Sequence, residues 1–271
     1  ATRASLLALF CVGVLLQSAS AQTYYWDNND ATAGFGTAGG TWAAPTTNNS
    51  TQGWSTSSAG TSALSGTTNT TTSDALNFGT GSAGLAAGTI TVSGTVNANS
   101  LTFGSASGNI TLSGGTITLG GTTPTITTNN TNDTISSVLA GSAGLTKNGT
   151  GTLTLSAGNS YTGGTTINAG TLKIGASNVI GGNVTINSGA TLDGSGHHGP
   201  VTSSTNLIIN GGTVIGGHSQ QISSVSMTNG SLQGSGANNN YFIVNGLTLS
   251  GNNTITAGID IRTVAAGTFN V

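Results

Sequence analysis

The sequence predicts an all-β fold, a parallel β-helix (solenoid) of about 20 residues per coil that begins with an irregular Trp-rich cap. Two observations support this prediction. Short segments alternate Ile, Leu or Val with Thr, Ser or Asn between glycines, which is the pattern of a strand with one apolar face. Comparable segments then recur about every 20 residues, so that each strand stacks on its counterpart one coil away.

The composition favours strands and argues against helices. Of 271 residues, 45 are Gly, 49 Thr, 33 Ser and 28 Asn, whereas 4 are Lys or Arg and 6 are Asp or Glu. Thr and Gly are poor helix formers, and a hydrophobic content of 35% is too high for a solvated disordered chain. The net charge of −2 gives no reason to expect nucleic acid as a partner.

Residues 1–21 are predicted to be a secretory signal peptide. Arg3 precedes an apolar stretch at 6–16, and the small residues Ala-Ser-Ala follow at 19–21 as a cleavage site. The apolar stretch is too short to cross a bilayer comfortably. Cys11, the one cysteine, lies inside this segment, so we expect an exported chain without disulfides or thiolate metal sites.

The remainder of the chain divides at about residue 84. Residues 22–84 contain all three Trp and lack clear alternation, and we expect them to cover one end of the stack, where bare strand edges would pair with other chains. Residues 85–271 contain the alternating segments and form the predicted β-helix. The sequence stops at 269–271 in a strand-like segment, so we expect a piece of a longer protein.

The spacing of the apolar residues predicts two strand positions in each coil. One series of apolar centres, each one coil length after the last, is Leu153, Leu172, Leu192, Val214 and Leu232. A second series, with similar steps, is Ile167, Ile186, Ile208, Met227 and Leu247. Glycine-led segments at 170–172, 189–192 and 211–214 recur once per coil and predict its corners. A sandwich of hairpins, with a strand about every 8–12 residues, is the alternative fold.

A continuous stretch, 145–175, contains the most specific motif. It reads Leu-Thr-Lys-Asn-Gly-Thr-Gly-Thr-Leu-Thr-Leu at 145–155 and continues with Tyr-Thr-Gly-Gly-Thr-Thr at 161–166 and Gly-Thr-Leu at 170–172. The motif positions are Gly149, Gly151, Leu153, Leu155, Tyr161, Gly163, Gly164, Ile167, Gly170 and Leu172. This stretch closely resembles the autotransporter-associated β-strand repeat, also called the passenger-associated transport repeat.

The resemblance implies a right-handed parallel β-helix passenger, displayed on or released from a Gram-negative cell surface. We therefore expect a non-catalytic stalk or adhesin that contacts cell-surface glycans or other cells, and that reaches the outer membrane only through a C-terminal part outside this chain. No cofactor is expected. The alternative is the scaffold of a carbohydrate-active enzyme whose catalytic part lies outside this fragment. We expect the ring of Tyr161 to pack over a corner of its coil.

The carboxylates give little support to catalysis. Asp74, Asp133, Asp193 and Asp260 follow one another at intervals of about three coils, so none forms the close pair that a polysaccharide-cleaving enzyme needs. Asp27 and Asp30, in the order Asp-Asn-Asn-Asp, could bind Ca²⁺, but a solvated turn is the preferred interpretation. The scattered basic residues Lys147, Lys173 and Arg262 are expected on the surface.

Histidine provides one candidate metal site. His197 and His198 precede His218 by one coil length, so stacking would bring them to adjacent coils, where they could bind Zn²⁺ or Ni²⁺ with Asp193. Exposed corner residues are the preferred interpretation, and no metal is assigned. Thr-x-Thr pairs suggest an ice-binding face, but their irregular intervals along the chain do not give one pair per coil.

Overall fold

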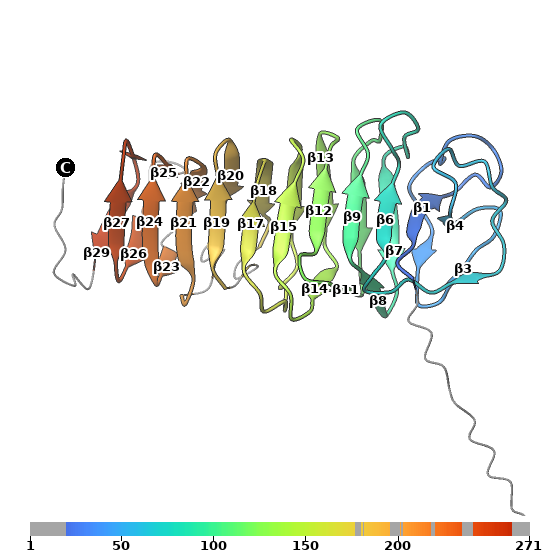
Figure 1. Ribbon diagram of the computed structural model, residues 1–271, viewed down its shortest axis with the longest axis horizontal. Coiled ribbons are helices and arrows are strands. Elements are labelled where there is room, and N and C mark those ends of the chain that lie inside the picture. The colour runs from blue at the N-terminus through green and yellow to red at the C-terminus, as the bar shows by residue number, and fades with distance from the viewer. Residues whose placement is uncertain are drawn as a thin grey trace, which may run out of the picture.

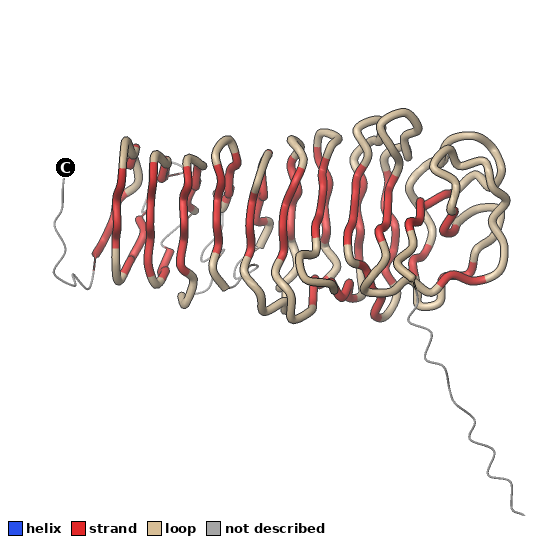
Figure 2. Tube along the Cα trace, in the orientation of Figure 1, coloured by secondary structure: helices blue, strands red, loops and turns tan. Residues whose placement is uncertain are grey.

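The computed structural model is a parallel β-solenoid in which strands from successive coils lie side by side (Figure 1). It describes residues 20–176, 180, 182–195, 201, 203–217, 220–234 and 241–261. Figure 2 shows that the described residues form strands and loops. These residues contain no helix that could cross a membrane. The all-β parallel prediction is therefore confirmed.

One sheet of 11 strands runs along the entire solenoid, and all its neighbouring pairs are parallel except β1 with β4. In spatial order it contains β27 (Leu247–Ser250), β24 (Ser224–Thr228), β21 (Asn206–Asn210), β19 (Val184–Asn187), β17 (Thr165–Ile167), β15 (Leu145–Asn148), β12 (Thr125–Thr128), β9 (Ser100–Phe103), β6 (Ala75–Phe78), β1 (Thr23–Asp27) and β4 (Gly53–Ser55). We call it the long sheet.

A second sheet of 10 parallel strands forms another side of the coils. In spatial order it contains β2 (Thr41–Trp42), β7 (Gly88–Val92), β10 (Ile110–Ser113), β13 (Asn132–Ile135), β16 (Thr152–Leu155), β18 (Gly170–Ile174), β20 (Ala190–Asp193), β22 (Thr213–Gly216), β25 (Ser231–Gly234) and β28 (Thr254–Ile255). We call it the second sheet.

Some coils have a third strand, which the sequence prediction of two strand positions missed. Two 3-stranded sheets supply it, and an antiparallel pair lies near the N-terminus. These are β8 (Thr95–Ala98), β11 (Thr116–Leu119) and β14 (Val138–Ala140); β23 (Gln220–Ile222), β26 (Tyr241–Val244) and β29 (Gly258–Ile261); and β3 (Thr46–Thr47) with β5 (Thr67–Thr68). The early coils have room for it because they are longer: Leu76 pairs with Leu101, whereas Leu153 pairs with Leu172. The coils average roughly 22 residues, slightly more than predicted.

The register confirms the first predicted series, since Leu153, Leu172, Leu192, Val214 and Leu232 pair one with the next. The second series is wrong at two positions. Ile186 pairs with Ile209, not Ile208, and Met227 pairs with Leu249, not Leu247. Residues 207–209 are Leu-Ile-Ile, so apolar side chains lie on both faces of this strand. Alternation alone therefore does not determine whether Ile208 or Ile209 points inward.

Most inward side chains form apolar columns along the axis, while most strand Thr and Asn side chains face outward. Leu153, Leu172 and Ile186 have no exposed surface, and each such side chain contributes roughly 1.5–3 kcal/mol when fully buried. The predicted glycine corners are also confirmed: Gly189 and Gly211, just before β20 and β22, have φ of 77° and 75°, a region that favours glycine.

The N-terminal end of the solenoid is filled by aromatic rings. Trp54, on the outermost strand β4, packs edge-on against Trp26 and Trp42, with centroid distances of 4.9 and 5.4 Å, and contacts Phe78 at 5.8 Å. The predicted division at residue 84 does not interrupt strand pairing, because β1 and β6 continue in register into β9. The region 22–84 therefore combines irregular loops with the first rungs of the long sheet.

Candidate functional site

The motif at 145–175 is built around a lysine inside the solenoid. Lys147 lies in an inward column of the long sheet, between Ile126 and Ile167, and has no exposed surface. Its Nζ donates to the carbonyl oxygens of Asn148, Gly149, Gly151 and Ala169 at 2.9, 2.9, 3.0 and 3.2 Å. One ammonium group thus holds together the corner that joins the two main sheets and the corresponding corner of the next coil.

The prediction that Lys147 lies on the surface is wrong. A charged side chain is rarely buried unless its donors find partners, and four carbonyl oxygens fulfil that condition here. The sequence did contain a sign that Lys147 is buried. Lys147 precedes Ile167 by one coil length and pairs with it, so it occupies the same inward position in its coil. Lys173, by contrast, lies on the outer face, where it contacts Asp193 at 3.9 Å.

Asp133 is a second charged group inside the solenoid. It occupies an inward position in the second sheet opposite Leu153, and its Oδ1 accepts hydrogen bonds from Ile110 N and Asn130 Nδ2 at 2.9 and 2.8 Å. Burial raises the pKa of Asp133 to about 6, although Lys147 acts in the opposite direction. Burial likewise lowers the pKa of Lys147 to about 8, and the carboxylate of Asp133 partly offsets that effect.

We expect Asp133 to make the stability of the fold dependent on pH. Its carboxyl binds a proton more tightly in the folded chain, with a pKa of about 6, than in the unfolded chain, whose pKa is near 3.8. The free energy of unfolding should therefore decrease as pH rises from about 4 to about 6, by on the order of 2–3 kcal/mol, and then level off. Asp133→Asn, which keeps the Oδ1 acceptor, should remove this contribution in urea titrations across that range. An unchanged pH dependence in the variant would contradict the assignment.

The motif glycines allow successive coils to approach closely. A Cβ on Gly151 would overlap the carbonyl oxygen of Asn130, and one on Gly163 would overlap the backbone of Gly144. Gly164 has a similar contact with Asn183. Gly149 and Gly170 also have positive φ values of 78° and 63°.

The remaining motif side chains fill the interior. Leu153, Leu155, Ile167 and Leu172 are fully buried. Tyr161 is 5% exposed, and its hydroxyl forms a 2.7 Å hydrogen bond with Thr165 Oγ1. Burial raises the pKa of Tyr161 to about 12, so the hydroxyl keeps its proton at physiological pH. These residues shape the coil and offer no reactive group to a ligand.

The outer face of the second sheet carries a column of hydroxyl groups, which we call the threonine ladder. Register places one hydroxyl on each successive strand from β16 to β28: Thr152, Thr171, Thr191, Thr213, Ser231 and Thr254. Neighbouring strands are about 4.8 Å apart. The Thr-x-Thr spacing within strands gave no sign of this column, because its members are a whole coil apart.

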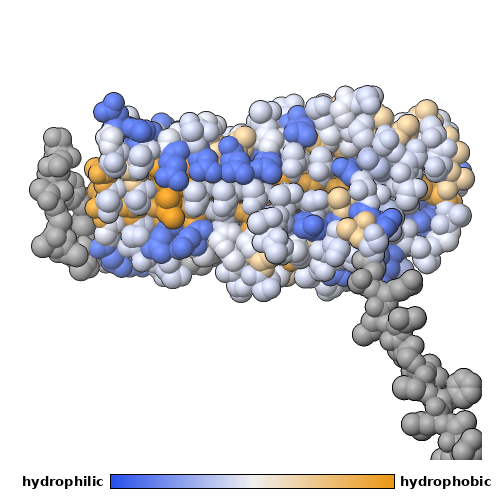
Figure 3. All heavy atoms as spheres, in the orientation of Figure 1, coloured by the Kyte–Doolittle hydropathy of each residue, from blue (hydrophilic) through white to orange (hydrophobic). Residues whose placement is uncertain are grey.

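The outer face of the long sheet carries an asparagine ladder. Asn168 Nδ2 donates to Asn148 Oδ1 at 2.9 Å, and Asn187 Nδ2 donates to Asn168 Oδ1 at 2.7 Å. Asn210 follows in register with Asn187. Strongly hydrophilic side chains form a row along the axis on this face (Figure 3).

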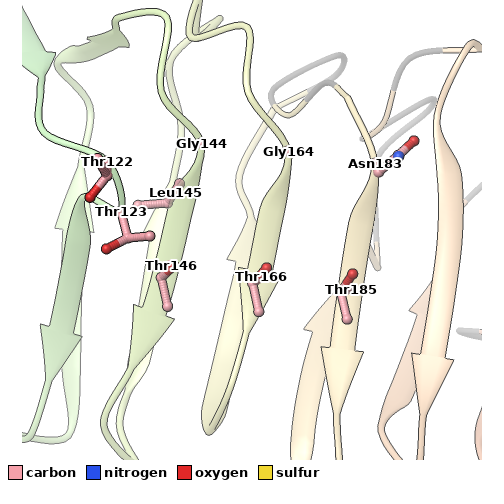
Figure 4. Close-up of a pocket in the computed structure, with 9 residues that line it drawn as sticks. All are labelled: Thr122, Thr123, Gly144, Leu145, Thr146, Gly164, Thr166, Asn183 and Thr185. Carbon is pink, nitrogen blue, oxygen red and sulfur yellow. The ribbon is translucent and has the colours of Figure 1, made fainter.

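A pocket lies beside the asparagine ladder, over β15, β17 and β19 (Figure 4). Its lining residues are Thr122, Thr123, Gly144, Leu145, Thr146, Gly164, Thr166, Asn183 and Thr185. Thr146, Thr166 and Thr185 are paired in register, so three hydroxyl groups from consecutive coils face it. The lining carries no charge, which suits an uncharged polar ligand better than an ion.

The remaining candidate residues from the sequence are the histidines, Arg262 and Asp27. His197, His198 and His218 lie outside the described residues, as does Arg262. Asp27, predicted in a solvated turn, is instead fully buried.

The carboxylates of Asp74 and Asp193 hold turns. Asp74 accepts hydrogen bonds from Gln22 N, Thr71 N and Thr71 Oγ1, and Asp193 accepts one from Ser195 N. Within the described ranges, no group of three or more His, Cys, Asp or Glu is placed to hold a metal.

Residues 145–174, which contain the glycine corner bound by Lys147, match the passenger-associated-transport-repeat family. The resemblance seen in the sequence is therefore confirmed. The chain is also similar to the adhesin BmaC autotransporter of Brucella suis biovar 1 (strain 1330), with 36% identity over 159 residues, or 59% of this chain. The chain spans 4% of that relative's length. No solved structure matches the chain.

Proposed function

We propose that this chain is a non-catalytic passenger segment of an exported surface protein, in which the solenoid is a rigid stalk and its outer faces bind glycans or other cells. The observation that carries the proposal is the pair of uncharged ladders. The threonine ladder and the asparagine ladder each present one polar group per coil in a fixed row.

Such a surface suits weak contacts that are repeated many times. A single hydroxyl or amide hydrogen bond contributes little net affinity, because it replaces a hydrogen bond to water. Rows of identical groups on a stiff scaffold allow several contacts to form together, and many copies on one surface multiply the effect. The similarity to an autotransporter adhesin supports the same role.

The placement of Asp74, Asp133 and Asp193 gives no support to glycoside hydrolysis. Glycoside hydrolysis needs two carboxyl groups that face the substrate about 5 to 10 Å apart. Asp133 is buried and Asp74 holds the turn at Thr71, so neither is available to a glycan on the outer face. Asp193 is engaged with Ser195 N and lies near Lys173.

Adhesion by beads that carry many copies of the chain tests the proposal. We expect such beads to bind cells or immobilised neutral glycans, whereas the free chain binds weakly. The variant with Thr171→Val, Thr191→Val and Thr213→Val keeps the shape of the threonine ladder and removes its hydroxyls, and it should retain less than one tenth of the adhesion. Incubation with polysaccharides should release no new reducing ends.

The control changes the same residue type on another face. Thr95→Val, Thr116→Val and Thr118→Val alter outward positions of β8 and β11, and adhesion should be unchanged. Equal loss in both variants, or no adhesion above beads that carry an unrelated protein, would contradict the proposal.

A further inference from the structure

The turn after β1 contains a buried carboxylate that lacks part of its hydrogen bonding. Asp27 ends β1 opposite Gly53 of β4 and has no exposed surface. Its Oδ1 accepts the N–H of Asn29 at 3.0 Å, which bends the carboxylate over the turn. Its Oδ2 is buried and has no hydrogen-bond donor.

The side chains of Asn28 and Asn29, which follow Asp27, also have buried oxygens without a hydrogen-bond donor. Asn28 Oδ1 and Asn29 Oδ1 are both shielded from solvent, and neither has a donor. The segment 34–37 covers them: Asn28 N donates to Phe35 O at 3.1 Å, Asn28 Nδ2 donates to Thr37 O at 2.9 Å, and a Cβ on Gly36 would lie 3.3 Å from Asn29 Cβ. Three consecutive residues thus each hold a buried acceptor oxygen without a partner.

Asp74 provides an internal comparison. It is as deeply buried as Asp27, yet both its oxygens have donors, from Gln22 N, Thr71 N and Thr71 Oγ1. Buried polar atoms in folded proteins nearly always have a partner, and a buried charge needs one most. Asp133 Oδ2 and the adjacent Asn130 Oδ1 also lack donors, but the turn at Asp27 differs in holding three such oxygens on consecutive residues.

We propose that the turn Asp27-Asn28-Asn29-Asp30 binds a Ca²⁺ ion, with Asp27 Oδ2 and the amide oxygens of Asn28 and Asn29 as ligands. Ca²⁺ takes carboxylate and amide oxygens in flexible geometry, with water completing the shell. Mg²⁺ demands a stricter octahedron, and Zn²⁺ prefers the nitrogen and sulfur ligands that this turn lacks. Asp30, whose Oδ1 accepts the N–H of Leu64, adds a second negative charge nearby.

The electrostatics of the turn agree with a cation. Burial, with a smaller contribution from the charge of Asp30, raises the pKa of Asp27 to about 6, although the hydrogen bond from Asn29 N acts in the opposite direction. A bound cation would offset both effects, since it favours the ionised carboxylate.

Terbium luminescence and calorimetry on the whole chain test the site, with Ca²⁺ and Tb³⁺ as the probes. Trp26 precedes Asp27 directly and can sensitise bound Tb³⁺. We expect one Ca²⁺ per chain, with a dissociation constant of about 10⁻⁴–10⁻³ M, sensitised Tb³⁺ emission that Ca²⁺ displaces, and a Tm that falls when the ion is chelated. Asp27→Asn keeps the Oδ1 acceptor and should weaken binding at least tenfold.

The matched control is Asp193→Asn, which removes the same charge from the other main sheet and should bind Ca²⁺ like the parent chain. Far-ultraviolet circular dichroism establishes that both variants fold. The proposal is overturned if the parent chain gives no heat and no sensitised emission at millimolar Ca²⁺ and Tb³⁺. Equal weakening in both variants would overturn it as well. Neither result bears on adhesion through the ladders.

Discussion

Lys147→Ala is expected to lower the free energy of unfolding by about 3–5 kcal/mol. The change leaves four backbone carbonyls without the donor that now joins them and opens a cavity in an inward column. It also removes the positive charge that partly stabilises the ionised form of Asp133. Urea unfolding followed by circular dichroism measures the loss.

Two variants separate the hydrogen bonds of Lys147 from its volume. Lys147→Met fills the column but provides no donor, so it should recover only the part of the loss that comes from the cavity. Lys173→Ala removes a lysine that is 47% exposed and should change stability by less than about 1 kcal/mol. If Lys147→Ala is as stable as Lys173→Ala, the ammonium does not hold the corners.

Trp54→Ala is expected to destabilise the N-terminal coils by about 3–5 kcal/mol. Trp54 lies on the last strand of the long sheet, and its ring contacts Trp26, Trp42 and Phe78. Coils of a solenoid contact only their neighbours, so the loss should be local. Hydrogen exchange should accelerate in β1, β4 and β6, while β16 and β18 remain protected.

Trp54→Phe is the matched variant for this end of the solenoid. It keeps a ring among the aromatic side chains and removes an indole N–H that is buried without an acceptor, so its loss should be clearly smaller. Uniform acceleration of exchange along the whole solenoid in Trp54→Ala would show that the coils unfold as one unit.

The coils could be predicted from the sequence because their side-chain pattern is local and repeated. Alternation fixes which residues of a strand point inward, and one coil length fixes the strand with which it pairs. Leu153, Leu172 and Leu192 satisfy both conditions, and their register was predicted correctly. Ile208 and Ile209 are both apolar, so alternation does not distinguish them, and the predicted pairing of Ile186 with Ile208 was wrong.

The polar interior was missed for a different reason. The prediction treated charge as a surface property, whereas Lys147 and Asp27 are buried by contacts that depend on backbone carbonyls and loop folding, not on residue type. The ladders were missed because their order runs between coils: Thr171 and Thr191 are adjacent in space but a whole coil apart in sequence. An alignment of successive coils, position by position, would have identified Lys147 and both ladders.

The hydrogen bonds that Lys147 makes to two successive coils also have a mechanical consequence. A force along the axis loads the hydrogen bonds between coils in series, since these bonds lie nearly parallel to the axis. The solenoid should therefore lengthen by the release of one coil at a time. Lys147 Nζ adds bonds to Gly151 and, one coil further on, to Ala169, so this rung should separate at a higher force than rungs joined by the strands alone.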